Sequence, residues 1–171
     1  MKCIHILLIL LLNSALTFGY STGITIGTWG QALSSNLMDP GTYIQLGMVR
    51  GITDRFEAEL FTAVQVTPLP GSTLYAGAGL IFSAAGPREH TDDRIPPYYN
   101  ALFSAGVLAG MNELYHGPSD IKTAIYLRFT PLALKGPYYG KRERAATAGL
   151  MYCLHDQSIS AFWNILLYDF Y

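Results

Sequence analysis

Residues 44–66, I-Q-L-G-M-V-R-G-I-T-D-R-F-E-A-E-L-F-T-A-V-Q-V, decide the fold. In the second half of this stretch apolar residues stand at alternate positions, with Glu57 and Glu59 between them. This is the two-residue period of a strand whose two faces differ. Residues 44–48 show the same period, and the Gly-Ile-Thr-Asp-Arg segment at residues 51–55 is typical of a tight hairpin turn. The stretch therefore predicts two antiparallel strands joined by a hairpin.

The same period recurs along the rest of the chain. We expect eight strands, within residues 24–32, 43–48, 56–66, 74–83, 103–112, 121–129, 144–154 and 158–171. Segments of about ten residues exceed the average globular strand and match the length needed to cross hydrocarbon at a tilt. The longest connections are expected at residues 84–99 and 133–144, on the same side as both termini.

The composition decides which face of these strands points outward. Hydrophobic residues make up 50% of the 171 residues and charged residues only 13%. A soluble sandwich buries its apolar face and needs charges outside, whereas a barrel in lipid needs an apolar exterior and tolerates a polar interior. We therefore predict an all-β protein, an eight-stranded antiparallel up-and-down transmembrane β-barrel. A soluble secreted lipocalin-like or sandwich protein is the alternative.

The second face of the strands carries the candidate site residues. An eight-stranded barrel is just wide enough for side chains to fill its interior, so polar residues of this face are expected to form a packed network. The predicted members are Glu57, Glu59, Lys122, Arg128, Tyr43, Tyr75 and Tyr126, with Gln45 and Trp29 beside them. Such a network either neutralises its own charges and holds the strands in register or gates a path for ions or a small solute. No ligand is indicated.

The N-terminal residues are typical of a targeting segment. Lys2 precedes the apolar run Ile4–Leu12, and small residues follow to Gly19, which predicts a secretory signal peptide over residues 1–19 and a barrel domain over residues 20–171. Removing Lys2 from the 11 basic residues leaves 10 against 12 acidic ones, a charge of about −2 that gives no reason to expect nucleic acid. Cys153 then has no partner for an internal disulfide.

Two segments carry a family resemblance. The hairpin Val49–Glu57 and the aromatic-rich end Phe162–Tyr171 resemble the small eight-stranded bacterial outer-membrane barrels of the OmpW and OmpA-domain type. The resemblance implies that the outer-membrane insertion machinery reads the C-terminal strand, which ends at Tyr171. Trp163, Ile165 and Leu167 follow the expected alternation. Asp169 departs from it, so either a bulge shifts the register or the signal is degenerate.

The same resemblance implies a compartment and a range of roles. It implies a monomer in the outer membrane of a diderm bacterium, with outer-membrane lipid as its partner. The roles are limited passage of small or hydrophobic molecules, a non-transporting part in envelope structure, or attachment at the surface.

Catalysis is a less favoured alternative. Some eight-stranded barrels act as lipid A deacylases or acyltransferases, using a His and a Ser near the outer rim, and His155 and Ser158 lie in the predicted last connection. Polar residues in this position are also typical of a tight turn. His90, with acidic neighbours, lacks the spacing of a known metal site. We therefore predict no enzyme activity, no cofactor and no metal.

Overall fold

Eight strands follow the two-residue periods of the sequence. The computed structural model describes residues 22–31, 41–67, 73–84, 98–111, 121–135 and 141–171. The strands are β1 (Thr22–Gln31), β2 (Gly41–Gly51), β3 (Phe56–Thr67), β4 (Leu74–Ser83), β5 (Tyr98–Met111), β6 (Lys122–Lys135), β7 (Lys141–Cys153) and β8 (Ile159–Phe170). In the part of the chain that the structure describes, no helix has the length and hydropathy to cross a membrane.

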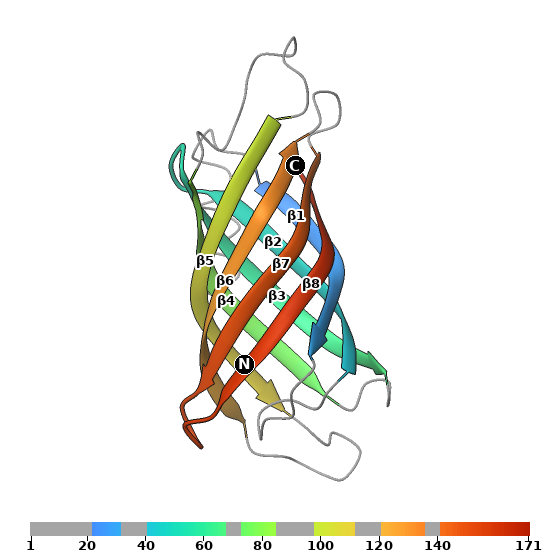
Figure 1. The fold of residues 1–171 in the computed structure, drawn as a ribbon, viewed down its shortest axis with the longest axis vertical. Helices are drawn as coiled ribbons and strands as arrows, with labels where there is room; N and C mark the ends of the chain where they lie inside the picture. The colour runs from blue at the N-terminus through green and yellow to red at the C-terminus, as the bar shows by residue number, and fades with distance from the viewer. Residues whose placement is uncertain (1–21, 32–40, 68–72, 85–97, 112–120, 136–140) are drawn as a thin grey trace, which may run out of the picture.

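Each strand pairs antiparallel with the next, and β8 pairs with β1, so the sheet closes into a barrel in chain order (Figure 1). Closure leaves no unpaired sheet edge. The predicted hairpin joins β2 to β3: the backbone N–H groups of Ile52 and Thr53 donate to the carbonyl of Phe56 over 2.8 and 3.1 Å. The predicted eight-stranded antiparallel up-and-down barrel is confirmed.

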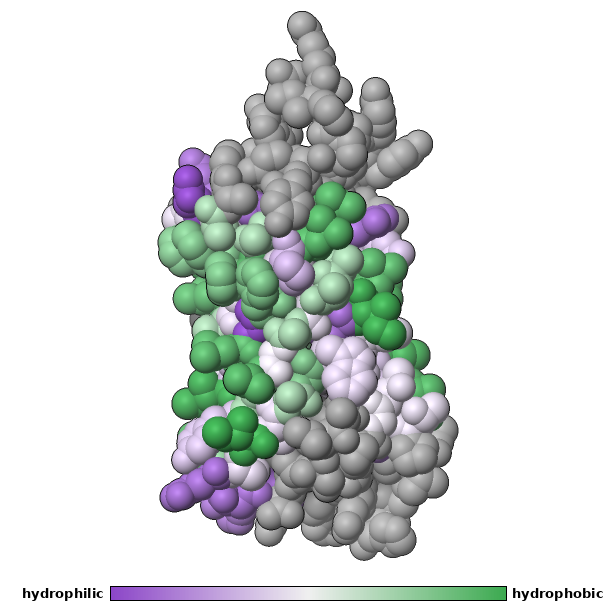
Figure 2. Space-filling view, in the orientation of Figure 1, coloured by the Kyte–Doolittle hydropathy of each residue, from purple (hydrophilic) through white to green (hydrophobic). Residues whose placement is uncertain are grey.

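The two faces point as their composition predicts. Leu46, Leu60, Leu80 and Leu127 lie on the outer wall and are between 43% and 61% exposed. Large exposed apolar side chains occur on all eight strands, and Figure 2 shows green, hydrophobic side chains over much of the strand wall on one face. The interior, in contrast, contains buried charged and polar side chains.

The predicted connection at residues 133–144 is wrong. Strand β6 continues to Lys135 and β7 begins at Lys141, so only residues 136–140 separate them. The charged run Lys141–Arg144 has no apolar face and for that reason did not read as a strand. A barrel interior accepts such residues when they are paired, which is why the ladder continues through them.

A line of irregularities crosses β6, β7 and β8. Buried side chains recur at every second residue along each strand, but this alternation shifts by one residue at one place in each of the three strands. The shift lies between Thr130 and Ala133 on β6, between Arg144 and Thr147 on β7, and between Asn164 and Leu167 on β8. The ladder register shifts by one residue between β5 and β6 and between β8 and β1. These shifts are β-bulges, which change the face toward which the following side chains point.

Two residues at the bulges of β6 and β7 have unusual backbones. Pro131 has no N–H to donate to the ladder, and Ala146 has a left-handed φ of 53°. Beside them the hydroxyls of Thr130 and Thr147 lie 2.7 Å apart in a hydrogen bond. Arg142, Arg144 and Asp169 all point into the barrel, and the departure of Asp169 from the alternation reflects the bulge in β8.

Candidate functional site

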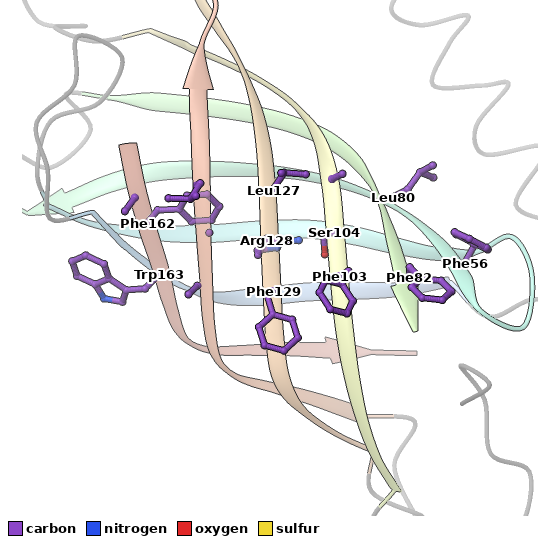
Figure 3. Close-up of a pocket in the computed structure, with 15 residues that line it drawn as sticks. Phe56, Leu80, Phe82, Phe103, Ser104, Leu127, Arg128, Phe129, Phe162 and Trp163 are labelled. Atoms are coloured by element: carbon purple, nitrogen blue, oxygen red, sulfur yellow. The ribbon is translucent and has the colours of Figure 1, made fainter. Parts of the chain in front are cut away.

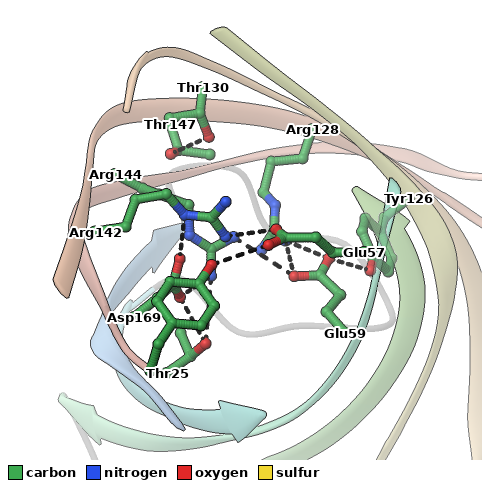
Figure 4. Close-up of polar contacts among 11 residues, drawn as sticks. Thr25, Glu57, Glu59, Tyr126, Arg128, Thr130, Arg142, Arg144, Thr147 and Asp169 are labelled. Atoms are coloured by element: carbon green, nitrogen blue, oxygen red, sulfur yellow. Dashed lines mark hydrogen bonds and ion pairs between the residues drawn. The ribbon is translucent and has the colours of Figure 1, made fainter. Parts of the chain in front are cut away.

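Three arginines and three carboxylates meet inside the barrel (Figure 4). Glu57 and Glu59 come from β3, Arg128 from β6, Arg142 and Arg144 from β7, and Asp169 from β8. Each of the six residues is at most 4% exposed. Equal numbers of opposite charges make this lumen network neutral as a group, which is the condition under which buried charge is tolerated.

Glu59 is the centre of the first cluster. Arg128 donates from Nη2 to both of its carboxylate oxygens, and the Tyr126 hydroxyl donates to Oε1 over 2.7 Å. The Arg128 guanidinium also lies 5.6 Å from the ring centroid of Tyr126 and 5.8 Å from that of Phe61. A planar cation held between a carboxylate and two rings is strongly confined.

Asp169 is the centre of the second cluster. Arg142 Nε lies 2.8 Å from Oδ2 of Asp169, Arg144 Nη2 lies 2.7 Å from Oδ1, and the Thr25 hydroxyl donates to Oδ1 over 2.7 Å. Arg144 Nη1 is also 3.6 Å from Oε2 of Glu59. Arg144 therefore joins the two clusters, and Asp169 joins β8 to β1 across the seam where the barrel closes.

Glu57 completes the network near the end of the chain. Its Oε2 lies 2.7 Å from Arg142 Nη2, and the Tyr171 hydroxyl donates to its Oε1 over 2.9 Å. The guanidinium of Arg142 lies over the Tyr171 ring at 5.6 Å. Burial raises the pKa of Tyr171, just beyond β8, well above its ordinary value; Arg142 opposes this shift and Glu57 adds to it. Tyr171 therefore remains a hydrogen-bond donor.

Aromatic side chains fill the other half of the lumen. The Trp29 ring lies 4.9 Å from Phe162, 5.9 Å from Tyr43 and 5.8 Å from Tyr75, measured between centroids. Phe61, 5.8 Å from Tyr126, connects this aromatic cluster to the charged network. Contacts of this kind stabilise a packed interior. The described lumen thus contains ion pairs in one half and rings in the other.

The structure brings together some of the predicted site residues and separates others. Glu57, Glu59, Arg128 and Tyr126 belong to the lumen network, whereas Tyr43 and Tyr75 belong to the aromatic cluster. Lys122 lies at the opposite end of β6 from the arginines of β7, in register with Gly110 of β5.

Sequence reasoning missed Arg142, Arg144, Asp169, Thr25 and Tyr171 as members of the network. The charged run Lys141–Arg144 and the break in alternation at Asp169 were the available signals. Both become interpretable only once the bulges are known.

The polar connection between β7 and β8 forms a turn. Asp156 Oδ1 accepts hydrogen bonds from the backbone N–H and the hydroxyl of Ser158, over 3.2 and 2.7 Å, and His155 is exposed. This Asx-type turn uses the polar side chains to close the chain between two strands. His90 and its acidic neighbours lie outside the described residues, as does the segment 1–19.

Comparisons of the chain with protein-family models, with curated proteins and with solved structures find no match.

Proposed function

We propose that the chain is an integral outer-membrane β-barrel protein of the small OmpW or OmpA-domain type, with a filled polar lumen. One observation carries the proposal: exposed apolar side chains surround the barrel on all eight strands, while the paired charges lie inside. A soluble protein rarely exposes an apolar surface of this extent. A barrel wall in hydrocarbon requires it.

The filled lumen supports a role without a large open pore. Ion pairs occupy the part of the described interior around Glu57, and aromatic rings occupy the part around Trp29. A non-transporting role in envelope structure or surface attachment fits such an interior directly. The barrel is proposed to act as a monomer in contact with outer-membrane lipid.

Limited passage of small or hydrophobic molecules is the second candidate, and one observation favours it. The Gln45 side chain is 1% exposed, and neither of its amide atoms has a hydrogen-bond partner among the described residues. The buried side-chain carbonyl oxygen of Asn164 also has no hydrogen-bond partner among the described residues. Buried polar atoms of this kind are ordinarily satisfied by water, so a hydrated path beside the network is consistent with them.

The outer-membrane insertion machinery is the proposed partner of β8. At the end of this strand Phe170 is 44% exposed on the outer wall, while Tyr171 donates its hydrogen bond inward to Glu57. Phe170 is therefore the ring that this strand end offers to a partner outside the barrel.

Cell fractionation combined with gel mobility before and after boiling tests the proposal. We expect the protein in the outer-membrane fraction, with a folded form that migrates differently until it is boiled. A soluble product without detergent would overturn the proposal and favour the lipocalin-like alternative.

A further inference from the structure

Part of the buried polar surface of the lumen has no hydrogen-bond partner within the described chain. The atoms concerned belong to eight residues that face the lumen and are at most 3% exposed. They are Nε1 of Trp29, Nε2 and Oε1 of Gln45, the hydroxyls of Thr73, Ser83 and Ser160, Nε of Arg128, Nε and Nη1 of Arg144, and Oδ1 of Asn164. Buried polar atoms are ordinarily paired with protein or with ordered water. These atoms therefore indicate a route for a molecule that forms hydrogen bonds.

The unpartnered atoms extend from one end of the barrel to the other. Thr73 directly precedes β4 and Ser83 is its last residue, so their hydroxyls mark the two ends of one strand. The two residues are ten positions apart, which is about 33 Å along a strand. Ser160 lies near the start of β8, at the same end of the barrel as Thr73.

Gln45 and Asn164 lie midway along the lumen, on either side of β1. Gln45 of β2 pairs with Gly27, and Asn164 of β8 donates from Nδ2 to the carbonyl of Thr28 over 2.9 Å. The two amide groups therefore enter the same part of the lumen from neighbouring strands. Trp29, two residues beyond Gly27 on β1, adds its Nε1 from the aromatic cluster.

Two arginines continue the series into the charged network (Figure 4). Arg128 binds Glu59 through Nη2, but its Nε has no partner among the described residues. Arg144 Nη1 lies 3.6 Å from Oε2 of Glu59, which is too long for a hydrogen bond. The arginines thus offer donors, while Gln45 and Asn164 offer acceptors. This combination suits a molecule that both donates and accepts, as water does.

The same lining disfavours ions and apolar molecules. A cation would meet the buried guanidinium groups of Arg128 and Arg144, and an anion would meet the buried carboxylates of Glu59 and Asp169. These charges already pair with one another, so neither sign of ion gains a free counter-charge. An apolar molecule would leave the polar atoms along the route without hydrogen bonds, which is costly.

The wall of the barrel offers little to a polar molecule. In the part of the wall drawn in Figure 3, outward side chains such as Phe103 and Leu127 are apolar, and the indole of Trp163 is the exception. Ser104 and Arg128 stand beside them in the same strands but face the lumen, where they are 4% and 3% exposed. A polar molecule therefore finds its partners inside the barrel.

We propose that the barrel passes water, and small uncharged molecules that hydrogen-bond as water does, along the unpartnered atoms of its lumen. The inference rests on the proposed function, because passage requires a membrane to be crossed. It names the substrate class for limited passage as polar and uncharged, instead of apolar or ionic.

Osmotic shrinkage of phosphatidylcholine vesicles that contain the full barrel tests the proposal. The vesicles are mixed rapidly with hyperosmotic sucrose, and light scattering follows the loss of water. We expect shrinkage to be faster than in protein-free vesicles, while a KCl gradient across the same vesicles decays no faster. Gel mobility before and after boiling establishes that the inserted barrel is folded.

Variants locate the route within the lumen. Gln45→Met removes both amide atoms at nearly unchanged side-chain length, so it should lose most of the added water flow. Gln65→Met is the matched control: Gln65 is 2% exposed, but its Nε2 already donates to the carbonyl of Thr67 over 3.1 Å, so this variant should keep the flow. Thr73→Val replaces a hydroxyl by a methyl group at the barrel's end and should slow the flow as well.

The failures of the two proposals are distinguishable. A folded, inserted barrel whose vesicles shrink no faster than protein-free ones overturns the water route and leaves the membrane proposal standing. The same holds if Gln45→Met and Thr73→Val pass water as fast as the unmodified barrel, or if Gln45→Met slows a KCl leak in parallel with water. A barrel that does not insert into the vesicles overturns the proposed function itself.

Discussion

Arg128 and Glu59 depend on one another, since each is buried and each is the main partner of the other. Arg128→Ala removes the closest cation from the buried Glu59 carboxylate and leaves it with Tyr126 and the more distant Arg144, so we expect a loss of about 3–5 kcal/mol in the free energy of unfolding. Removing both side chains should cost less than the sum of the single changes. Urea unfolding of the four proteins in a double-mutant cycle measures the coupling.

The comparison is the cycle of Arg128 with Glu57, which forms an ion pair with Arg142 instead. A smaller coupling energy is expected there, because Glu57 and Arg128 share the network but not an ion pair. Equal coupling in both cycles would contradict the pairing seen in the lumen.

The raised pKa of Tyr171 predicts that the stability of the barrel depends on pH. Because its pKa is raised in the folded barrel, its contribution to stability is fully present below the unfolded value of about 10 and is lost as the pH rises above it. Tyr171→Phe should lose about 1.5–3 kcal/mol at neutral pH, the contribution of a hydrogen bond to a charged group. The difference between variant and wild type should then shrink above pH 10.

Urea midpoints at several pH values provide the measurement. A difference that grows with pH would show that the Tyr171 hydroxyl does not donate to Glu57.

At the scale of the elements, the bulge in β7 depends on Ala146, whose φ of 53° is unfavourable for a residue with a Cβ. Glycine adopts this conformation freely, so Ala146→Gly should stabilise the barrel by about 0.5–1 kcal/mol. Ala148→Gly, two residues further along the same strand and on the same outer wall, should destabilise by about 0.5–1 kcal/mol. Unfolding in urea gives both values, and a change of the same sign in both variants would argue against the bulge.

A further prediction concerns charged substitutions on the outer wall of β6. Leu127 lies midway along the strand and is 61% exposed. Leu127→Arg should destabilise the barrel in lipid by about 2–4 kcal/mol, because the charge would lie in hydrocarbon. Leu154 is also exposed but lies in the turn at the barrel's end, where the cost of Arg should be about 0–1 kcal/mol. A soluble barrel would tolerate both changes equally, as refolding yields would reveal.

For the molecule as a whole, the ion pairs and rings inside the barrel predict little conductance. An eight-stranded barrel has space only for its own side chains, and Arg144 bridges both charged clusters across the interior. Purified protein in planar bilayers should therefore show small openings or none. Large, long-lived openings would contradict the filled lumen. Small openings that change when Glu59 or Arg128 is neutralised would raise limited passage above the structural role.

The sequence by itself determined the number of strands, their antiparallel order and the orientation of most side chains. These properties are local: alternation along β3 tells its faces apart, and the segment 51–55 turns the chain back within a few residues. A charged strand start such as Lys141–Arg144 carries no such contrast, so β7 was predicted to begin only at Arg144.

Only the tertiary structure decided which charges meet. Whether Glu59 faces Arg128 depends on the registers that accumulate between β3 and β6 around the barrel. Whether Asp169 points inward depends on a bulge in its own strand, and a one-residue shift exchanges the two faces of everything beyond it. The interior is therefore specified by the closure of the whole sheet, which no single segment of the chain contains.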